Sequence, residues 1–220
     1  MKVTQDLSHL DSHGEGEEVA NSVIHGFGAG LAVAALAILV TLAAKMGDPW
    51  RVVSFSIYGT TLVLLYAVST LYHGFRNRKL KQLFRVFDHL SIYLLIAGSY
   101  TPFMLVSLRG GWGWSLFGII WVFAALGVVQ ALLFVDRLKL LSLVAYLGMG
   151  WLIFIAFRPL IATVPPGGLV WLCIGGLCYT FGVLFYINKR IPFNHAIWHL
   201  FVLSGSVSHF FALLLYVLPE

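Results

Sequence analysis

The chain has 220 residues, of which 60% are hydrophobic and only 10% charged, and its mean hydropathy is +0.89. A soluble globular domain carries about 25% charged residues, so this composition excludes that class and indicates an integral membrane protein. The formal net charge of +5 does not predict nucleic-acid binding, because the basic residues fall in short segments between apolar runs, where they act as topology signals and face anionic lipid headgroups.

Two parts of the chain differ in composition. Residues 1–16 are polar and acidic, and we expect a flexible N-terminal tail there. Residues 17–220 contain seven apolar runs, and roughly 20 apolar residues span a bilayer, so we expect one all-α domain, a bundle of seven transmembrane helices. The predicted spans cover residues 18–44, 52–75, 86–108, 112–135, 140–157, 169–187 and 193–217.

The first two spans carry polar side chains that are unusual in a membrane helix. The first span opens with Glu18, Asn21 and His25, and the second ends with Ser69 and His73. Ser69 and His73 are four residues apart and therefore lie on one helical face. Ionisable groups inside a membrane helix are costly and usually face the interior of the bundle.

A basic segment, residues 76–85, is expected to form the loop before the third span. The third span begins with Asp88 and His89 and contains Pro102, which we expect to kink the helix. The fourth, fifth and sixth spans are largely apolar.

The seventh span begins with two histidines, His195 and His199. Four steps of about 100° bring the second back to within roughly 40° of the first, so one metal ion can contact both imidazoles. His209 follows on the same helix, but its ten-residue separation from His199 corresponds to about 15 Å, too far to share that ion.

The distribution of Lys and Arg predicts the orientation of the bundle. Ten of the 14 basic residues fall in the N-terminal segment and in the loops after the second, fourth and sixth spans, and four fall in the other loops. Cytoplasmic loops carry the excess of positive charge. We therefore expect a cytoplasmic N-terminus and a C-terminus outside.

This orientation brings polar residues of several spans to the cytoplasmic side. His73 ends the second span and Asp88 begins the third, while His195 and His199 begin the seventh. Three histidines with an open fourth position make a catalytic type of zinc site, in which the pKa of the bound water falls to near 7. Asp88 can orient that water or take its proton, and Ser69 can donate a hydrogen bond to it or to an oxyanion. The alternative is a buried polar network that locks the helices, or a proton path.

Together these motifs resemble the haemolysin III family, the bacterial branch of the progestin and adipoQ receptor (PAQR) superfamily, which is grouped with alkaline ceramidases as metal-dependent membrane hydrolases. The resemblance extends from about Glu17 to Tyr216. Its motifs are Glu18-x2-Asn21-x3-His25, Ser69-x3-His73, the Asp88 stretch with residues 97–103, and Asn194-His195-x3-His199.

The resemblance implies roles for individual residues. His73, His195 and His199 correspond to the ligands of a Zn²⁺ cofactor, Asp88 to the aspartate that holds a zinc-bound water, and Ser69 to the serine of the same motif. For Glu18, Asn21 and His25 we expect bonds to neighbouring groups or helix capping rather than contact with the metal.

The function expected from the resemblance is membrane lipid or energetic homeostasis in the bacterial inner (cytoplasmic) membrane. A zinc-dependent hydrolase that cleaves an amide or ester of an acyl lipid would fulfil it, with membrane lipids as substrate or ligand. The alternatives are a non-catalytic, receptor-like regulator with a structural zinc ion, a cytolytic pore-forming protein, and a proton-coupled role.

Overall fold

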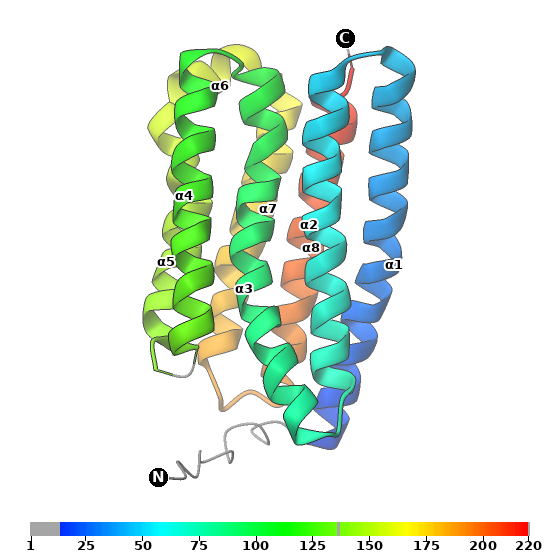
Figure 1. The fold of residues 1–220 in the computed structure, drawn as a ribbon, viewed down its shortest axis with the longest axis vertical. Coiled ribbons are helices and arrows are strands. Elements are labelled where there is room, and N and C mark those ends of the chain that lie inside the picture. The colour runs from blue at the N-terminus through cyan, green and yellow to red at the C-terminus, as the bar shows by residue number, and fades with distance from the viewer. Residues whose placement is uncertain (1–13, 136, 220) are drawn as a thin grey trace.

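The computed structural model describes residues 14–135 and 137–219. Within them the chain is helical and contains no strand, and seven helical segments are long and apolar enough to cross a membrane. This confirms the predicted all-α bundle of seven membrane-spanning helices (Figure 1). The elements are α1 (Glu15–Met46), α2 (Pro49–Gly74), α3 (Arg78–Pro102), the π-helix η2 (Phe103–Ser107), α4 (Gly111–Phe134), α5 (Lys139–Trp151), the 3₁₀-helix η3 (Leu152–Ala156), α6 (Phe157–Thr163), α7 (Pro166–Ile187) and α8 (Asn194–Tyr216).

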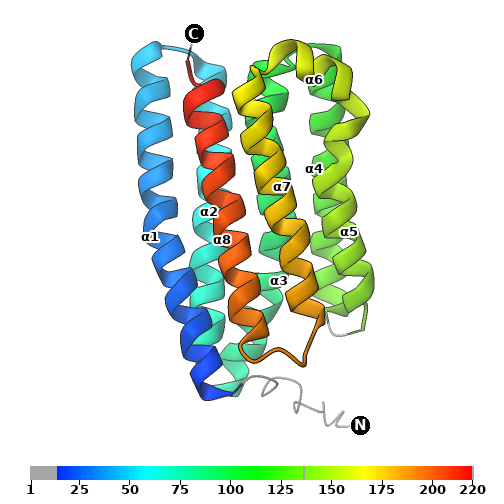
Figure 2. The same cartoon turned by 180° about the vertical axis from the view of Figure 1, so that it is seen from behind.

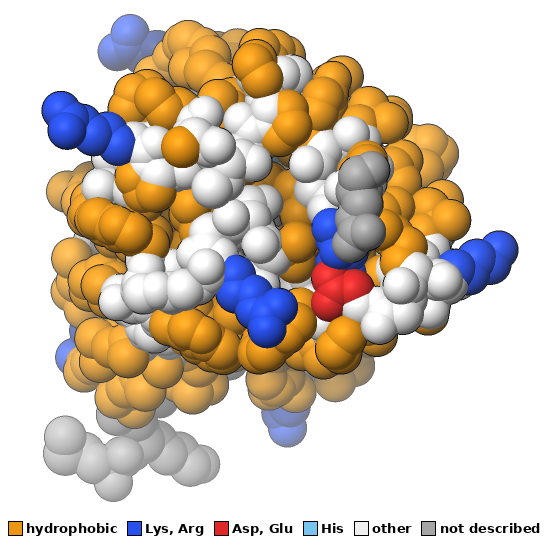
Figure 3. All heavy atoms as spheres, turned by 90° about the horizontal axis from the view of Figure 1, so that it is seen from above, with side chains coloured by type: hydrophobic (Ala, Val, Ile, Leu, Met, Phe, Trp, Pro, Cys, Tyr) orange, Lys and Arg blue, Asp and Glu red, His pale blue; other side chains and the backbone are white. Residues whose placement is uncertain are grey.

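The helices form a ring in which most neighbours in sequence are neighbours in space. Helices α1, α2, α3 and α4 pack in order, α7 packs on α8, and α8 closes the ring against α1 (Figures 1 and 2). Helices α1 and α8 begin at the same end of the bundle, and α8 finishes at the opposite end. Seen from that opposite end, hydrophobic side chains surround the molecule and only scattered charged side chains interrupt them (Figure 3).

The basic segment that was expected to be a loop is largely helical. Helix α3 begins at Arg78 because the Asn77 side chain caps it: Asn77 Oδ1 accepts hydrogen bonds from the backbone N–H groups of Lys79 (3.0 Å) and Leu80 (3.3 Å). The prediction of a loop over residues 76–85 was therefore wrong from Arg78 onward. The stretch is helical because one of its faces, which includes Lys81, is buried against the bundle.

Two other boundaries differ from the predicted spans. The irregularity expected at Pro102 takes the form of η2, a π-helical turn that directly follows it. The fifth span continues through η3 and α6 to Thr163, beyond the predicted end at residue 157. Pro159 does not stop it, because this proline lies in the first turn of α6, where its missing N–H would have no helical partner.

Helix α1 starts at Glu15, so the last two residues of the predicted tail belong to the helix. The rest of that prediction, over residues 1–13, lies outside the described part of the chain.

A close approach of α1 and α2 positions one aromatic ring for the site. A Cβ atom on Gly28 would lie 2.6 Å from Cδ1 of Tyr66, which real side chains do not tolerate. Glycine at this position therefore lets the fully buried Tyr66 ring pack against α1, where its centroid lies 5.0 Å from that of His25.

Candidate metal centre

Three histidines from two helices converge at the end of the bundle where α1 and α8 begin. His73 lies in the last turn of α2, and His195 and His199 lie in the first two turns of α8. One nitrogen of each lies within 4.8 Å of a nitrogen of each of the others. All three residues are buried, with exposed fractions of 4%, 8% and 0%.

One donor pair already has the spacing that a tetrahedral zinc ion requires. His73 Nε2 lies 3.2 Å from His199 Nε2. Two imidazole nitrogens at 2.0–2.1 Å from a tetrahedral zinc ion lie about 3.3 Å apart. Three neutral imidazoles are a donor set that suits zinc and leaves a fourth position open. The residues present therefore fit a bound metal ion.

A carboxylate on α1 sets the orientation of the His73 ring. Glu18 Oε2 lies 2.8 Å from His73 Nδ1 and 2.9 Å from Lys81 Nζ. Because a carboxylate paired with a lysine accepts hydrogen bonds, His73 donates from Nδ1 and keeps the lone pair on Nε2 for the metal side. The Asn21 amide nitrogen is also near, 3.4 Å from His73 Nδ1.

The beginning of α8 is held by two further contacts. The backbone N–H of His195 donates to Glu17 Oε1 at 2.9 Å, so α1 supplies an acceptor to the first turn of α8. Asn194 Nδ2 donates to the carbonyl of Phe185 at 3.0 Å, which ties α8 to the end of α7. In the loop between α7 and α8, burial lowers the pKa of Lys189, although the charge of Glu17 acts in the opposite direction.

Ser69 and Asp88 belong to different helices, α2 and α3. Ser69 is fully buried one turn before His73, and its Oγ has no hydrogen-bond partner among the described residues. Asp88 lies in α3, with its Oδ2 atom 3.8 Å from Nδ1 of the neighbouring His89, whose Nδ1 also lies 2.9 Å from the Arg85 carbonyl oxygen. Asp88 is not one of the three residues whose donor atoms cluster, and instead borders a cavity.

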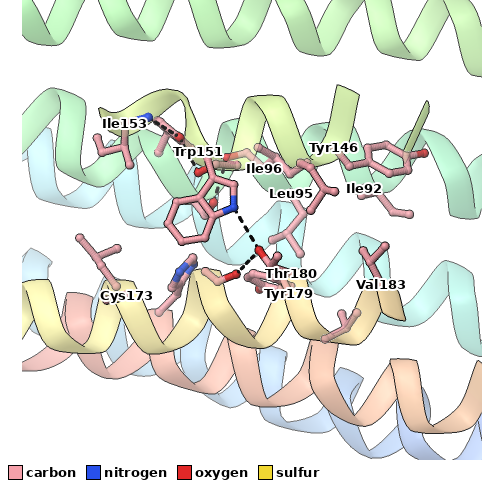
Figure 4. A pocket seen from close by; sticks show the side chains of 18 of the residues that line it. Ile92, Leu95, Ile96, Tyr146, Trp151, Ile153, Cys173, Tyr179, Thr180 and Val183 are labelled. Atoms are coloured by element: carbon pink, nitrogen blue, oxygen red, sulfur yellow. Dashed lines mark hydrogen bonds between the residues drawn. The ribbon is translucent and has the colours of Figure 1, made fainter. Parts of the chain in front are cut away.

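That cavity has a volume of about 370 Å³ and lies between α3, α5, α7 and α8 (Figure 4). His25 and Asp88 contribute polar groups at the end of the cavity nearest the three histidines, and most of the remaining wall is apolar. Deeper in the wall, two polar side chains are hydrogen-bonded within the protein: Trp151 Nε1 donates to Thr180 Oγ1 at 3.0 Å, and Thr180 Oγ1 donates to the Gly176 carbonyl at 2.8 Å. The cavity is therefore suited to a largely aliphatic ligand.

Two further histidines are not among the three clustered donors. His25 lies in α1 with its ring centroid 3.7 Å from that of His199. His209 also borders the cavity, next to Tyr179 at a centroid distance of 5.4 Å, and follows His199 by ten residues on α8, or about 15 Å.

The sequence analysis missed two residues of this site, Glu17 and Lys81. An acidic pair, Glu17 and Glu18, at the head of an apolar helix was a usable signal. Lys81 was assigned to a loop, although its spacing from Asp88 in sequence would put both on one helical face.

The chain is similar to known proteins over most of its length. Residues 14–210 match the family model described as "Haemolysin-III related". "Hemolysin-3" of Bacillus cereus is 48% identical over 203 residues, which cover 92% of this chain and 93% of that protein. "Hemolysin-3 homolog" of Bacillus subtilis (strain 168) is 48% identical over 200 residues, covering 91% and 94%. The human "Monocyte to macrophage differentiation factor" is 33% identical over 210 residues, covering 91% and 84%.

Proposed function

This chain belongs to the haemolysin III family, and from that premise we propose that it is a zinc-containing membrane protein that hydrolyses an amide or ester bond of an acyl lipid. Such an activity would serve membrane lipid homeostasis. The observation that carries the proposal is the juxtaposition of a buried three-histidine cluster with an apolar cavity that has Asp88 and His25 in its wall.

His73, His195 and His199 would hold the zinc ion, with Glu18 fixing the ring of His73. A bound zinc ion supplies Lewis acidity and lowers the pKa of water to about 7. The clustering of three buried imidazoles supports this assignment, because their ring nitrogens lie close enough together to share one ion.

The carboxylate of Asp88 would act as the general base. It accepts a proton from the attacking water as the oxygen of that water bonds to the acyl carbon, and returns it to the leaving amine or alcohol. Its place in the cavity wall supports this role. Ser69 would donate a hydrogen bond to the same water from the side of α2, which is supported by its buried hydroxyl beside His73.

The cavity would bind the acyl chain. Its volume of about 370 Å³ falls in the range of small-molecule sites, roughly 300–1,000 Å³. Isoleucine, leucine and valine side chains from α3 and α7 face it (Figure 4), and burying a methylene group against such a wall is worth about 0.8 kcal/mol.

We propose that the end of the bundle that carries the three histidines faces the cytoplasm. The excess of Lys and Arg in the loops at that end supports this orientation. In a bacterial cell the substrate would then reach the site from the cytoplasmic leaflet of the inner membrane.

A second candidate is a regulator in which zinc acts only as a structural clamp. The observation that favours it is that the three histidines join α2 to α8, two helices far apart in the chain. In this case metal binding contributes stability and no bond is cleaved.

One experiment separates the two. Zinc-loaded protein in lipid nanodiscs is incubated with a panel of phospholipids and N-acyl lipids, and released fatty acid is measured by mass spectrometry for the wild type and for Asp88→Asn. We expect release by the wild type and a loss of about 10²–10⁴-fold in the variant, with an unchanged zinc content. Zinc-loaded wild type that releases no fatty acid would refute the hydrolase and leave the clamp.

A further inference from the structure

His25 is a buried imidazole with no hydrogen-bond partner at either nitrogen among the described residues. Only 2% of the surface of His25 is exposed to solvent. Leaving a buried donor or acceptor unpaired costs about 1–3 kcal/mol, so such a group in a native protein calls for a specific explanation. His25 therefore has a function that its protein contacts do not supply.

The position of His25 narrows the range of groups that its imidazole can bind. Its ring contacts that of His199 at a centroid distance of 3.7 Å with a tilt of 59°, and the Tyr66 ring lies nearly perpendicular to it at 5.0 Å. The residue also contributes to the cavity wall, on the same side as Asp88. His25 thus contacts the three-histidine cluster and lines the cavity at the same time.

His25 is not one of the three clustered donors, whose nitrogens lie within 4.8 Å of one another. Other residues of α1 support the cluster, since Glu18 and Asn21 contact His73. Ser69, the other candidate hydrogen-bond donor, does not border the cavity. Among these groups His25 alone combines an unused N–H with access to a ligand in the cavity.

We propose that the imidazole N–H of His25 binds the carbonyl oxygen of the acyl group whose chain fills the cavity. This inference rests on the proposed function and assigns a substrate contact to it. His25 thereby aligns the acyl carbon between the metal cluster and Asp88, and its hydrogen bond strengthens as negative charge develops on that oxygen. The ligand class is a neutral acyl amide or ester, since a free carboxylate at this point would meet the charge of Asp88.

The test measures the preference for a carbonyl group separately from the affinity for the chain. Hexadecanamide and hexadecane compete with a fluorescent acyl probe for the protein in nanodiscs. The wild type should prefer the amide. In His25→Leu the amide should lose about tenfold in affinity, the worth of one hydrogen bond, while hexadecane binds as before. His25→Gln, which retains an N–H donor, should keep part of the preference.

A matched control on the same helix is Ser22→Ala. The Ser22 hydroxyl donates to the Thr70 carbonyl at 3.1 Å and joins α1 to α2 away from the cavity. This variant should keep the full amide preference. Cobalt-substituted protein gives a readout that does not depend on turnover: the visible spectrum of His25→Leu should match that of the wild type.

The outcomes distinguish the two proposals. If neither compound displaces the probe from the wild type, the acyl-lipid function falls and the inference with it. If both bind but His25→Leu retains the amide preference, only the assignment of His25 is overturned. A changed cobalt spectrum or loss of metal in His25→Leu would make His25 a metal ligand, which also overturns it.

Discussion

Glu18 Oε2 lies 2.8 Å from His73 Nδ1 and 2.9 Å from Lys81 Nζ, so a single carboxylate oxygen on α1 joins α2 and α3 beside the metal cluster. Carboxylate partners of metal-binding histidines fix the tautomer and raise the basicity of the ligand. This contact makes α1 part of the candidate metal centre, although none of the three clustered histidines belongs to α1.

Replacing this carboxylate tests its role. Glu18→Gln should lower zinc affinity by about 10–100-fold, because the neutral amide polarises the His73 ring less. Zinc affinity is measured by competition with a chelator of known strength. The control is Glu15→Gln, an exposed residue in the first turn of the same helix. Equal affinities in the two variants would contradict the orienting role.

Removing two of the ligands should abolish metal binding. We expect about one zinc ion per chain in the wild type and none in His195→Ala/His199→Ala, as measured by elemental analysis of purified protein. A metal that binds only the folded state stabilises it by about 2.7 kcal/mol at a hundred times its dissociation constant. A chelator should therefore lower the melting temperature of the wild type and leave that of the double variant unchanged. Zinc retained by the double variant would exclude this site.

The contact between Gly28 and Tyr66 should be sensitive to a single methyl group. Gly28→Ala places Cβ 2.6 Å from the Tyr66 ring, and overpacking of this kind costs about 1–3 kcal/mol in the free energy of unfolding. Gly30→Ala on the same helix is the control, because nothing lies within 4 Å of its Cβ position. Thermal melting in detergent should show a drop for the first variant only.

Filling the cavity should impair acyl binding without affecting the metal. Val183 lines the cavity, whereas the adjacent Leu184 is exposed on the outer face of α7. Val183→Phe should weaken displacement of a fluorescent acyl probe by about tenfold or more, roughly the 1–3 kcal/mol of an overpacked site. Leu184→Phe should behave as the wild type. Equal effects of the two substitutions would argue that the probe binds elsewhere.

Hydropathy and residue spacing were sufficient for the architecture. The seven spans follow from apolar runs, and the pairing of His195 with His199 follows from a four-residue repeat on a helix. That His73 joins this pair follows from the common depth of the two helix ends, once the number of spans is known.

The rest of the site depends on how each helix is rotated and where it begins. Lys81 reaches Glu18 only because α3 starts at Arg78, a boundary set by the Asn77 cap within a stretch whose charge resembled a loop. His25 and Ser69 are equally polar in sequence, and only packing decides that the first borders the cavity while the second does not. Neither difference has a signature in hydropathy.

The metal cluster draws on the second helix and on the last, with support from the first. During synthesis the nascent chain therefore carries one of the three histidines until its final helix has been inserted. A chain that stops before Asn194 lacks both His195 and His199 and also the helix that closes the ring against α1. The three-histidine cluster can therefore form only after the last helix has joined the bundle.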